Sequence, residues 1–414
     1  MRIHRNLGRL KPSDTLTISQ ISNKRQREGQ PVYKFGFGQS PFPVPEIVIQ
    51  ALKDNAHQKD YLPVQGLELL RKKIAAHTNQ LLNNSNYNSG NIFLGPGSKE
   101  LIYLAQLAID APLLVPNPSW VSYEPQAHII GKKTHWIPTK PNYWKLEAEH
   151  LEAYLEAHQI RGGILILNYP NNPTGQTFST FELKNLAEVC RQYNIAVISD
   201  EIYGLLQFDG EYESIANYYP EGSIITTGIS KWAGAGGWRL GAMIIPDNFK
   251  SLYKTMKALA SETFSAVSAP IQYAAVEAYS VDLATSNYQK ASRYILDTIG
   301  NYCYQTLKSG EVEVQAAEGG FYLFPNFTGM VEVDNSVLLC QRLLEETGVA
   351  LLPGSSFGRP IDELTVRLCF VDFDGQAALS HYYKYGDIKD SDIPKLFPNM
   401  LNGMNRLMKW IENN

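Results

Sequence analysis

Short apolar runs alternate with amphipathic stretches through the first two thirds of the chain. The runs hold Ile, Leu and Val with little polar alternation, which is typical of strands buried on both faces. The intervening stretches carry helical periodicity, first near 46–56 and again at 66–81. This alternation predicts an α/β fold in which a mostly parallel seven-stranded sheet is sandwiched by helices. The predicted strands are residues 92–94, 113–115, 134–137, 163–167, 195–199, 224–227 and 240–245.

After Pro246 the pattern changes to longer helical stretches. A long helix is expected around 270–308, and it would lead into a second, smaller α+β domain. That domain is expected to contain strands at 320–324 and 366–370 and a final helix near 394–412.

The same changes in pattern predict three parts of the chain. Residues 1–45 are polar at first and then rich in aromatic residues, glycine and proline, and we expect them to form a wall that packs with the small domain. A large domain is expected at 46–300, and a small C-terminal domain at 301–414. A length of 414 residues suits two domains.

Composition narrows the classes of partner. The apolar fraction is 44% and the formal net charge is −4, which are ordinary values for a globular protein. Lysine and arginine are scattered along the chain, so we expect no nucleic-acid partner. No apolar run reaches the ~18–20 residues of a membrane span, and the N-terminus lacks the apolar core of a secretory signal.

The four cysteines carry no CxxC pairing. We therefore expect neither a disulfide framework nor a zinc site, and a reducing compartment such as the cytoplasm.

One glycine-dense stretch, 228–242, holds a lysine and an arginine among small residues. Lys231 follows the apolar run Ser223–Thr227, and Arg239 offers a planar fork suited to a phosphate. An amine that attacks carbonyls beside a phosphate clamp is what pyridoxal phosphate chemistry requires. The alternative is a flexible surface loop with two ordinary cations.

Two other strands are expected to deliver polar side chains to the same edge of the sheet. Asn172 follows the strand 163–167 in a stiff Asn- and Pro-rich loop, and Asp200 and Tyr203 follow the strand 195–199. A carboxylate that emerges from a buried run needs a cation or hydrogen bonds, and the pyridinium nitrogen of pyridoxal phosphate would be such a cation. The alternatives are a simple turn at Asn172 and a helix-capping aspartate.

Two weaker signals lie upstream. Ser98 and Lys99 open a helix after a short strand, and backbone N–H groups at such a position can bind a phosphate. Trp120 follows the strand 113–115, where its indole could stack on a planar ring. Many helices begin with glycine and serine, and most tryptophans belong to a core, so neither signal decides alone.

Taken in order, these segments resemble the class I/II aminotransferases, which are fold type I pyridoxal phosphate enzymes. The resemblance covers residues 35–370 and rests on Asn172–Gly175, Asp200–Tyr203, Ser230 and Lys231 followed by Arg239, and Val366–Leu368. It implies pyridoxal phosphate as the cofactor, bound by the large domain.

The resemblance also implies a role for each matching residue. Lys231 corresponds to the Schiff-base lysine that moves the substrate proton, Asp200 to the partner of the pyridine nitrogen, and Asn172 and Tyr203 to the ligands of the phenolic oxygen. Trp120 corresponds to the stacking aromatic residue. The phosphate ligands implied are Ser98, Lys99, Ser230 and Arg239.

For the substrate, the resemblance implies that Arg367 grips the α-carboxylate, with the backbone of Gly38 beside it. Tyr61 corresponds to a tyrosine that reaches the phosphate of a neighbouring subunit, which implies a homodimer. The predicted substrate contacts are therefore Gly38, Trp120, Asn172 and Arg367.

Two positions depart from the family pattern. Gly228 stands where many relatives have a phosphate-binding serine. The segment 261–265 lacks the arginine with which some relatives bind dicarboxylic substrates. Aspartate specificity by that route is therefore not expected.

The resulting prediction is an aminotransferase that moves an amino group between an L-amino acid and a 2-oxo acid. Aromatic residues near the expected entrance suggest a neutral or aromatic donor, although they could equally be packing residues: Tyr33, Phe35, Phe37, Phe42 and Tyr123. A lyase or cyclase of the same fold is the alternative. A cofactor-sensing regulator would need a DNA-binding module, for which the segment before Phe35 is too short.

Overall fold

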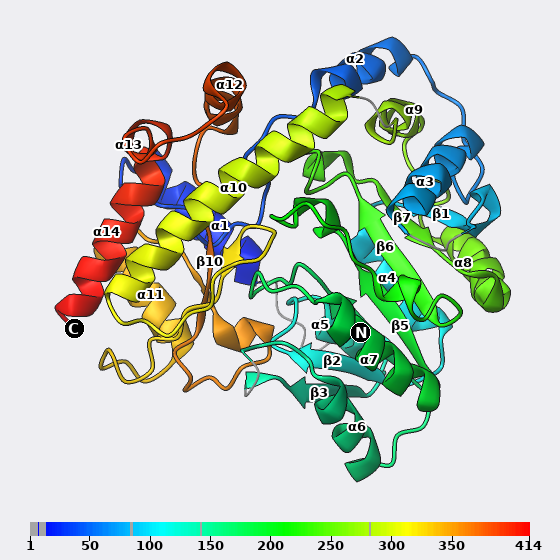
Figure 1. Ribbon diagram of the computed structural model, residues 1–414, viewed down its shortest axis with the longest axis horizontal. Coiled ribbons are helices and arrows are strands. Elements are labelled where there is room, and N and C mark those ends of the chain that lie inside the picture. The colour runs from blue at the N-terminus through cyan, green and yellow to red at the C-terminus, as the bar shows by residue number, and fades with distance from the viewer. Residues whose placement is uncertain (1–6, 8–13, 83–85, 141–142, 281–282) are drawn as a thin grey trace, which may run out of the picture.

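The computed structural model describes residues 7, 14–82, 86–140, 143–280 and 283–414 (Figure 1). Residues 1–6 and 8–13, on which the predicted absence of a secretory signal depends, lie outside this part of the chain.

The larger of two sheets has seven strands, as predicted. Its order is β1-β7-β6-β5-β4-β2-β3, and the pairs among β3, β2, β4, β5 and β6 are all parallel. Strand β7 is antiparallel to both of its neighbours. The strands are β1 (Ile92–Gly95), β2 (Leu113–Asn117), β3 (Thr134–Pro138), β4 (Gly163–Asn168), β5 (Ile195–Asp200), β6 (Ser223–Gly228) and β7 (Gly241–Ile244).

The antiparallel direction of β7 follows from its connection. Only residues 229–240 join β6 to β7, and they contain no α-helix. Twelve residues only reach the lower limit for a crossover to a parallel neighbour, and such a crossover is usually a helix that packs on the sheet, which this connection lacks. The chain therefore turns back at the carboxyl end of β6, and this turn contains Lys231 and Arg239.

Helices cover both faces of this sheet (Figure 1). Along β4, Ile164 and Ile166 pack into one cluster, and Leu165 and Leu167 pack into the other. This alternation explains the continuous apolar run, because both faces are buried. One face packs on α6 (Ala148–Ala157) and α7 (Thr180–Gln192), and the other on α4 (Ser98–Ala108), α5 (Tyr123–Ile129) and α8 (Lys250–Glu262).

A second, three-stranded antiparallel sheet has the order β8-β10-β9. Strands β8 (Tyr322–Leu323) and β10 (Val366–Cys369) fall within the two predicted segments. Strand β9 (Leu352–Pro353) was not predicted, because two residues carry no periodicity. Helix α11 (Ser336–Thr347) contacts β9, and the chain ends with α12 (Gly375–Tyr385), α13 (Ile393–Leu396) and α14 (Pro398–Glu412).

The helix expected around 270–308 is described as two helices, α9 (Ala269–Ala278) and α10 (Leu283–Ser309). Residues 281 and 282, between them, lie outside the described part of the chain. Figure 1 shows α10 as a long diagonal helix that leads from the region of α2 (Glu46–Asn55) toward α14. The predicted boundary at 300/301 falls inside α10, and the division into domains stays a prediction.

The N-terminal segment contains a helix, α1 (Asp14–Arg27), where the polar sequence had suggested an irregular wall. The backbone after it joins the residues that surround the small sheet. Tyr33 forms a bridge with Val349, and the Cys369 N–H donates to the Phe35 carbonyl at 2.7 Å. Residues 33–35 therefore lie against backbone beside the small sheet.

Two further observations concern the cysteines and membrane-spanning helices. Cys190, Cys303, Cys340 and Cys369 are each buried and free. Across the residues that the structure describes, no helix has both the length and the apolar character of a membrane span.

Candidate active site

A cavity of about 490 Å³ opens at the carboxyl ends of the central strands. Ten of the predicted site residues line it: Gly38, Ser98, Lys99, Trp120, Asn172, Asp200, Tyr203, Ser230, Lys231 and Arg239. Gln39, Tyr123, Asn168, Ile202, Gly236 and Gly237 complete the wall.

The topology brings these residues together. Strands β4, β5 and β6 are adjacent and parallel, so the segments that follow them meet at one edge of the sheet. Asn168 joins two of these segments: its Nδ2 donates to the Asp200 carbonyl at 2.8 Å, and its Oδ1 accepts from the Asn172 N–H at 2.7 Å. The loop after β4 is therefore fixed to the end of β5.

Lys231 lines the cavity, and its amine is held by a backbone carbonyl. Its Nζ donates to the Gly38 carbonyl at 2.6 Å and lies 5.4 Å from the centre of the Tyr203 ring. None of the ion pairs among the described residues involves Lys231. Burial, and secondarily the positive charge of Arg367, lowers the pKa of Lys231 to about 8. A lysine in this state is a nucleophile near neutral pH.

Asp200 is buried at the end of β5, and both of its carboxylate oxygens accept hydrogen bonds. The Tyr123 hydroxyl donates to Oδ2 at 2.6 Å, and the Thr226 hydroxyl donates to Oδ1 at 3.0 Å. Burial raises the pKa of Asp200, and these hydrogen bonds oppose the rise. None of the ion pairs among the described residues involves Asp200, so a cationic ligand atom would complete its surroundings.

Arg367, on β10, is buried beside the cavity rather than in its wall. Its guanidinium donates to Asn172 Oδ1 at 3.0 Å and to the Gly36 carbonyl at 2.8 Å. Its Nε is buried without a hydrogen-bond partner. An unused donor of a buried cation is suited to an anion such as a carboxylate.

At the other end of the cavity, Arg239 reaches the start of α4. It donates to the Pro96 carbonyl at 3.1 Å, and a Cβ at Gly97 would lie 2.3 Å from its Nη2. Gly97 has a φ of +95°, which further excludes other residues. Burial and the charge of Arg239 lower the pKa of Lys99, whose Nζ lies 4.9 Å from the centre of the Trp120 ring. These cations and the free N–H groups of α4 form an anion site.

The glycine at position 228 has a packing reason. A Cβ there would lie 2.8 Å from the Leu240 carbonyl oxygen and 3.1 Å from the Cα of Gly241, because the turn from β6 to β7 brings the two strands together. A serine at this position would require the backbone around Leu240 to shift.

Two groups of predicted residues do not line the cavity. The Tyr61 side chain is 95% exposed and lies outside the wall. Four of the five aromatic residues proposed for the entrance also fail to line it: Phe35 and Phe42 are core residues, and Tyr33 and Phe37 pack against buried clusters. Tyr123 is fully buried against Asp200 and is not an entrance residue. The basis for an aromatic donor is thereby removed.

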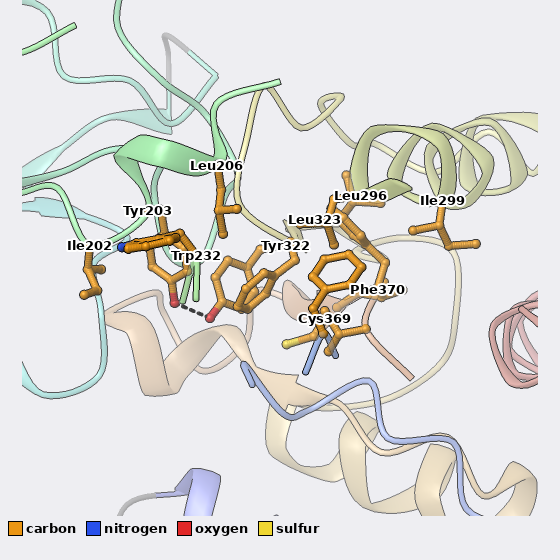
Figure 2. Packing of buried hydrophobic residues seen from close by; sticks show 14 of the residues in the cluster. Ile202, Tyr203, Leu206, Trp232, Leu296, Ile299, Tyr322, Leu323, Cys369 and Phe370 are labelled. Atoms are coloured by element: carbon orange, nitrogen blue, oxygen red, sulfur yellow. Dashed lines mark hydrogen bonds between the residues drawn. The ribbon is translucent and has the colours of Figure 1, made fainter. Parts of the chain in front are cut away.

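Sequence reasoning missed three residues that hold the site. The sequence predicts Thr226 only as a strand residue and Tyr123 as an entrance residue. Tyr322 lies in a predicted strand, and its hydroxyl is 2.5 Å from that of Tyr203 (Figure 2). Buried tyrosines and threonines close to strand ends are a weak signal, because the partner of each lies on another strand.

Comparison with known proteins places the chain in a family. Residues 30–374 match the family described as aminotransferase class I and II. The chain belongs to this family. The resemblance inferred from the motifs is confirmed, so the protein is an aminotransferase whose family uses pyridoxal phosphate.

Individual relatives agree with this assignment. The chain is 32% identical over 388 residues to aspartate aminotransferase of Geobacillus stearothermophilus, with 87% of this chain and 93% of the relative covered. It is 32% identical over 369 residues to a probable aspartate/prephenate aminotransferase of Aquifex aeolicus, covering 86% and 91%. The structure of Thermus thermophilus aspartate aminotransferase with maleate has the same fold, with a TM-score of 0.85, 24% identity and coverage of 99% and 100%.

The Asp200 contacts predict a pH-dependent stability effect in Tyr123→Phe. In the cofactor-free protein at pH 7, we expect a loss of about 1–2 kcal/mol, because a buried carboxylate loses a donor. Burial raises the pKa of Asp200 in the folded protein. The protonated carboxyl therefore favours the folded state at low pH, and this contribution to stability is lost as pH rises through the folded pKa. The variant's loss should therefore shrink toward acidic pH in urea titrations. Tyr288→Phe is the control: its hydroxyl donates to the uncharged Pro43 carbonyl, so its penalty should not vary with pH.

The Lys231 environment predicts the opposite pH dependence for Lys231→Met. The folded pKa of about 8 lies below the unfolded value of ~10.4, so the buried ammonium destabilises the fold at pH 7. Removing it should stabilise the cofactor-free protein by about 1–3 kcal/mol at pH 7. The gain should fade as pH rises from 8 toward 10.5 in urea titrations at several pH values. A gain that stays constant across this window would contradict the assigned environment.

Proposed function

We propose that this aminotransferase uses Lys231 as its proton carrier and L-aspartate as its preferred amino donor, with a 2-oxo acid as acceptor. The observation that carries the proposal is the Lys231 amine, which is held in the cavity by a carbonyl oxygen with its pKa lowered to about 8. A neutral amine at this position can both attack a carbonyl and accept a proton.

The residues present fit pyridoxal phosphate. Arg239, Ser98, Lys99 and the start of α4 offer donors for a phosphate, and the buried Asp200 carboxylate suits a protonated ring nitrogen. When bound, the cofactor supplies an electron sink for the charge that develops as an amino acid loses its Cα proton. Trp120 offers a ring face for stacking, and Asn172 and Tyr203 offer donors for the ring oxygen.

Residues of the chain itself bind the substrate and move its proton. The Arg367 guanidinium holds the substrate α-carboxylate, and its unused Nε supports this role. The Gly38 backbone lies beside the Lys231 amine and narrows the site around the reacting carbon. Lys231 Nζ accepts the Cα proton. Asp200, kept in place by Tyr123 and Thr226, holds a negative charge at the far side of the cavity.

The choice of aspartate rests on charge and on the named relatives. Lys99, Lys231 and Arg239 line the cavity against the single carboxylate of Asp200, so the wall favours anionic ligands. The relatives described above bear aspartate aminotransferase names. No arginine occurs in residues 261–265, so a side-chain carboxylate would be bound by another group.

We also propose that the active form is a homodimer in the cytoplasm. The exposed Tyr61 side chain lies outside its own cavity, which supports the expectation that it serves a second copy of the chain. The four free cysteines support a reducing compartment.

The first test examines cofactor binding and its attachment to Lys231, and the same protein then serves to compare amino donors. The cofactor-loaded protein should show a visible absorbance band, and borohydride should fix the label on Lys231. Lys231→Ala should lose both, whereas Lys254→Ala, on the exposed side of α8, should keep both.

The donor panel uses the same material. Without a 2-oxo acid, aspartate should change the band by one equivalent and stop, whereas a lyase would continue to release product. Aspartate should exceed phenylalanine at least ~10-fold in kcat/KM, a factor that corresponds to one charge-assisted contact. A faster reaction with phenylalanine would contradict the proposed donor, and continuous turnover would contradict the reaction.

A second test addresses the α-carboxylate. In Arg367→Lys the cation remains but its planar fork is lost, so KM for every donor should rise roughly 10- to 100-fold, since hydrogen bonds of this kind contribute about 1.5–3 kcal/mol. Arg359→Lys is the matched control, because Arg359 also forms a two-point contact with a carboxylate, Glu363, outside the cavity wall. Equal KM values for wild type and Arg367→Lys would remove Arg367 from the site.

A further inference from the structure

We propose that Tyr322 is a positioning residue that connects the substrate-binding arginine to the cofactor-binding tyrosine, by directing the Tyr203 hydroxyl proton into the cavity. This inference rests on the proposed roles of Tyr203, Asn172 and Arg367. Tyr322 does not line the cavity, so it would act through these residues.

The position of Tyr322 follows from the register of the small sheet. Tyr322 on β8 pairs with Cys369 on β10, and Arg367 is two residues from Cys369. Side chains two residues apart share a face of a strand, and paired residues share a face of the sheet. Tyr322 and Arg367 therefore project from the same face, and the guanidinium carbon lies 4.8 Å from the centre of the Tyr322 ring.

The Tyr322 hydroxyl meets residues that follow strands of the large sheet. It lies 2.5 Å from the Tyr203 hydroxyl and accepts from Asn172 Nδ2 at 3.4 Å. Figure 2 shows the two tyrosine hydroxyls turned toward each other, with Cys369 and Phe370 of the small sheet nearby. The orientation of the Asn172 amide is fixed, because its Oδ1 accepts from Arg367 at 3.0 Å.

Donor and acceptor capacity sets the direction of this hydroxyl chain, which we define as Asn172 Nδ2, Tyr322 Oη and Tyr203 Oη. Burial raises the pKa of both tyrosines, so each hydroxyl keeps its proton. The amide nitrogen of Asn172 cannot accept a hydrogen bond. Among the described residues, the Tyr322 proton therefore has one hydrogen-bond acceptor, the Tyr203 oxygen. The Tyr203 proton is then left to point into the cavity.

The space around the hydroxyl is also fixed. A Cβ at Gly38 would lie 2.2 Å from the Tyr322 oxygen but 3.1 Å from its ring carbon Cζ. The Gly38 carbonyl accepts from Lys231 Nζ. A displacement of Tyr322 would therefore disturb both the hydroxyl chain and the segment that holds the lysine.

The test is Tyr322→Phe, which removes the hydroxyl and keeps the ring beneath Arg367. In the protein loaded with pyridoxal phosphate, the pH midpoint of the visible absorbance should rise by about half a unit to one unit. A weaker donor stabilises the anionic ring oxygen less, so the adjoining lysine nitrogen holds its proton more tightly. Tyr203→Phe should shift the midpoint in the same direction and further, and adding Tyr322→Phe to it should produce no additional shift. Tyr288→Phe, which also loses one buried hydroxyl contact, should leave the midpoint unchanged.

A second measurement needs no cofactor. Gly38→Ala should lower the thermal unfolding temperature of the cofactor-free protein, and this loss should be smaller in a Tyr322→Phe background, where the clashing oxygen is gone. Equal losses in the two backgrounds would contradict the hydroxyl position.

The outcomes separate the two proposals. A wild-type protein without a visible band, or with the borohydride label on another residue, would end the proposed function and this inference together. A normal wild-type band that Tyr203→Phe shifts and Tyr322→Phe does not would overturn this inference alone. Additive shifts in the double variant would also overturn it, because the two hydroxyls would then act independently.

Discussion

The short turn from β6 to β7 is the constraint on which the site depends. Because residues 229–240 contain no crossover helix, β7 must run back along β6, and the turn stays at the carboxyl edge of the sheet. That edge is also where β4 and β5 end, so the lysine of the turn meets the side chains that follow both strands. The close approach of Gly228 to the Leu240 carbonyl shows how tightly the two strands are held.

The charged side chains that line the cavity are not fully compensated by other described residues. Burial shifts the pKa of Asp200 upward and that of Lys231 downward, so both groups are biased toward their neutral forms. Lys99 and Arg239 also line the cavity, and neither forms an ion pair with a carboxylate in the part of the chain that the structure describes. A ligand with an anionic group at one end and a cationic ring atom at the other would satisfy these groups at once. Its binding would then stabilise the fold by mass action, by an amount that grows with the logarithm of the ligand concentration relative to Kd.

Local sequence predicted the large sheet well and the contacts of the site only in part. The apolar runs of β4 and β5 are long and are buried on both faces, so their pattern is unambiguous. Asp200 and Lys231 were found because a charged residue after a buried run is unusual. Thr226 and Tyr123 were missed because their roles arise from pairing between strands and from helix packing. The aromatic residues at 33–42 were misplaced for the same reason, since composition does not distinguish a cavity wall from a core.

In the proposed function the two sheets contribute different parts of the chemistry, so their relative position would be part of the mechanism. The large sheet carries the groups suited to the cofactor, and β10 carries the arginine suited to the substrate carboxylate. Arg367 donates hydrogen bonds to Asn172 and to Gly36. A substrate carboxylate must therefore either bind the free Nε or compete with these two acceptors. Competition would release the Asn172 amide, whose other end contacts Tyr322. Substrate binding on the small sheet would in this way alter hydrogen bonding at Tyr203 on the large one, without any movement of the sheets themselves.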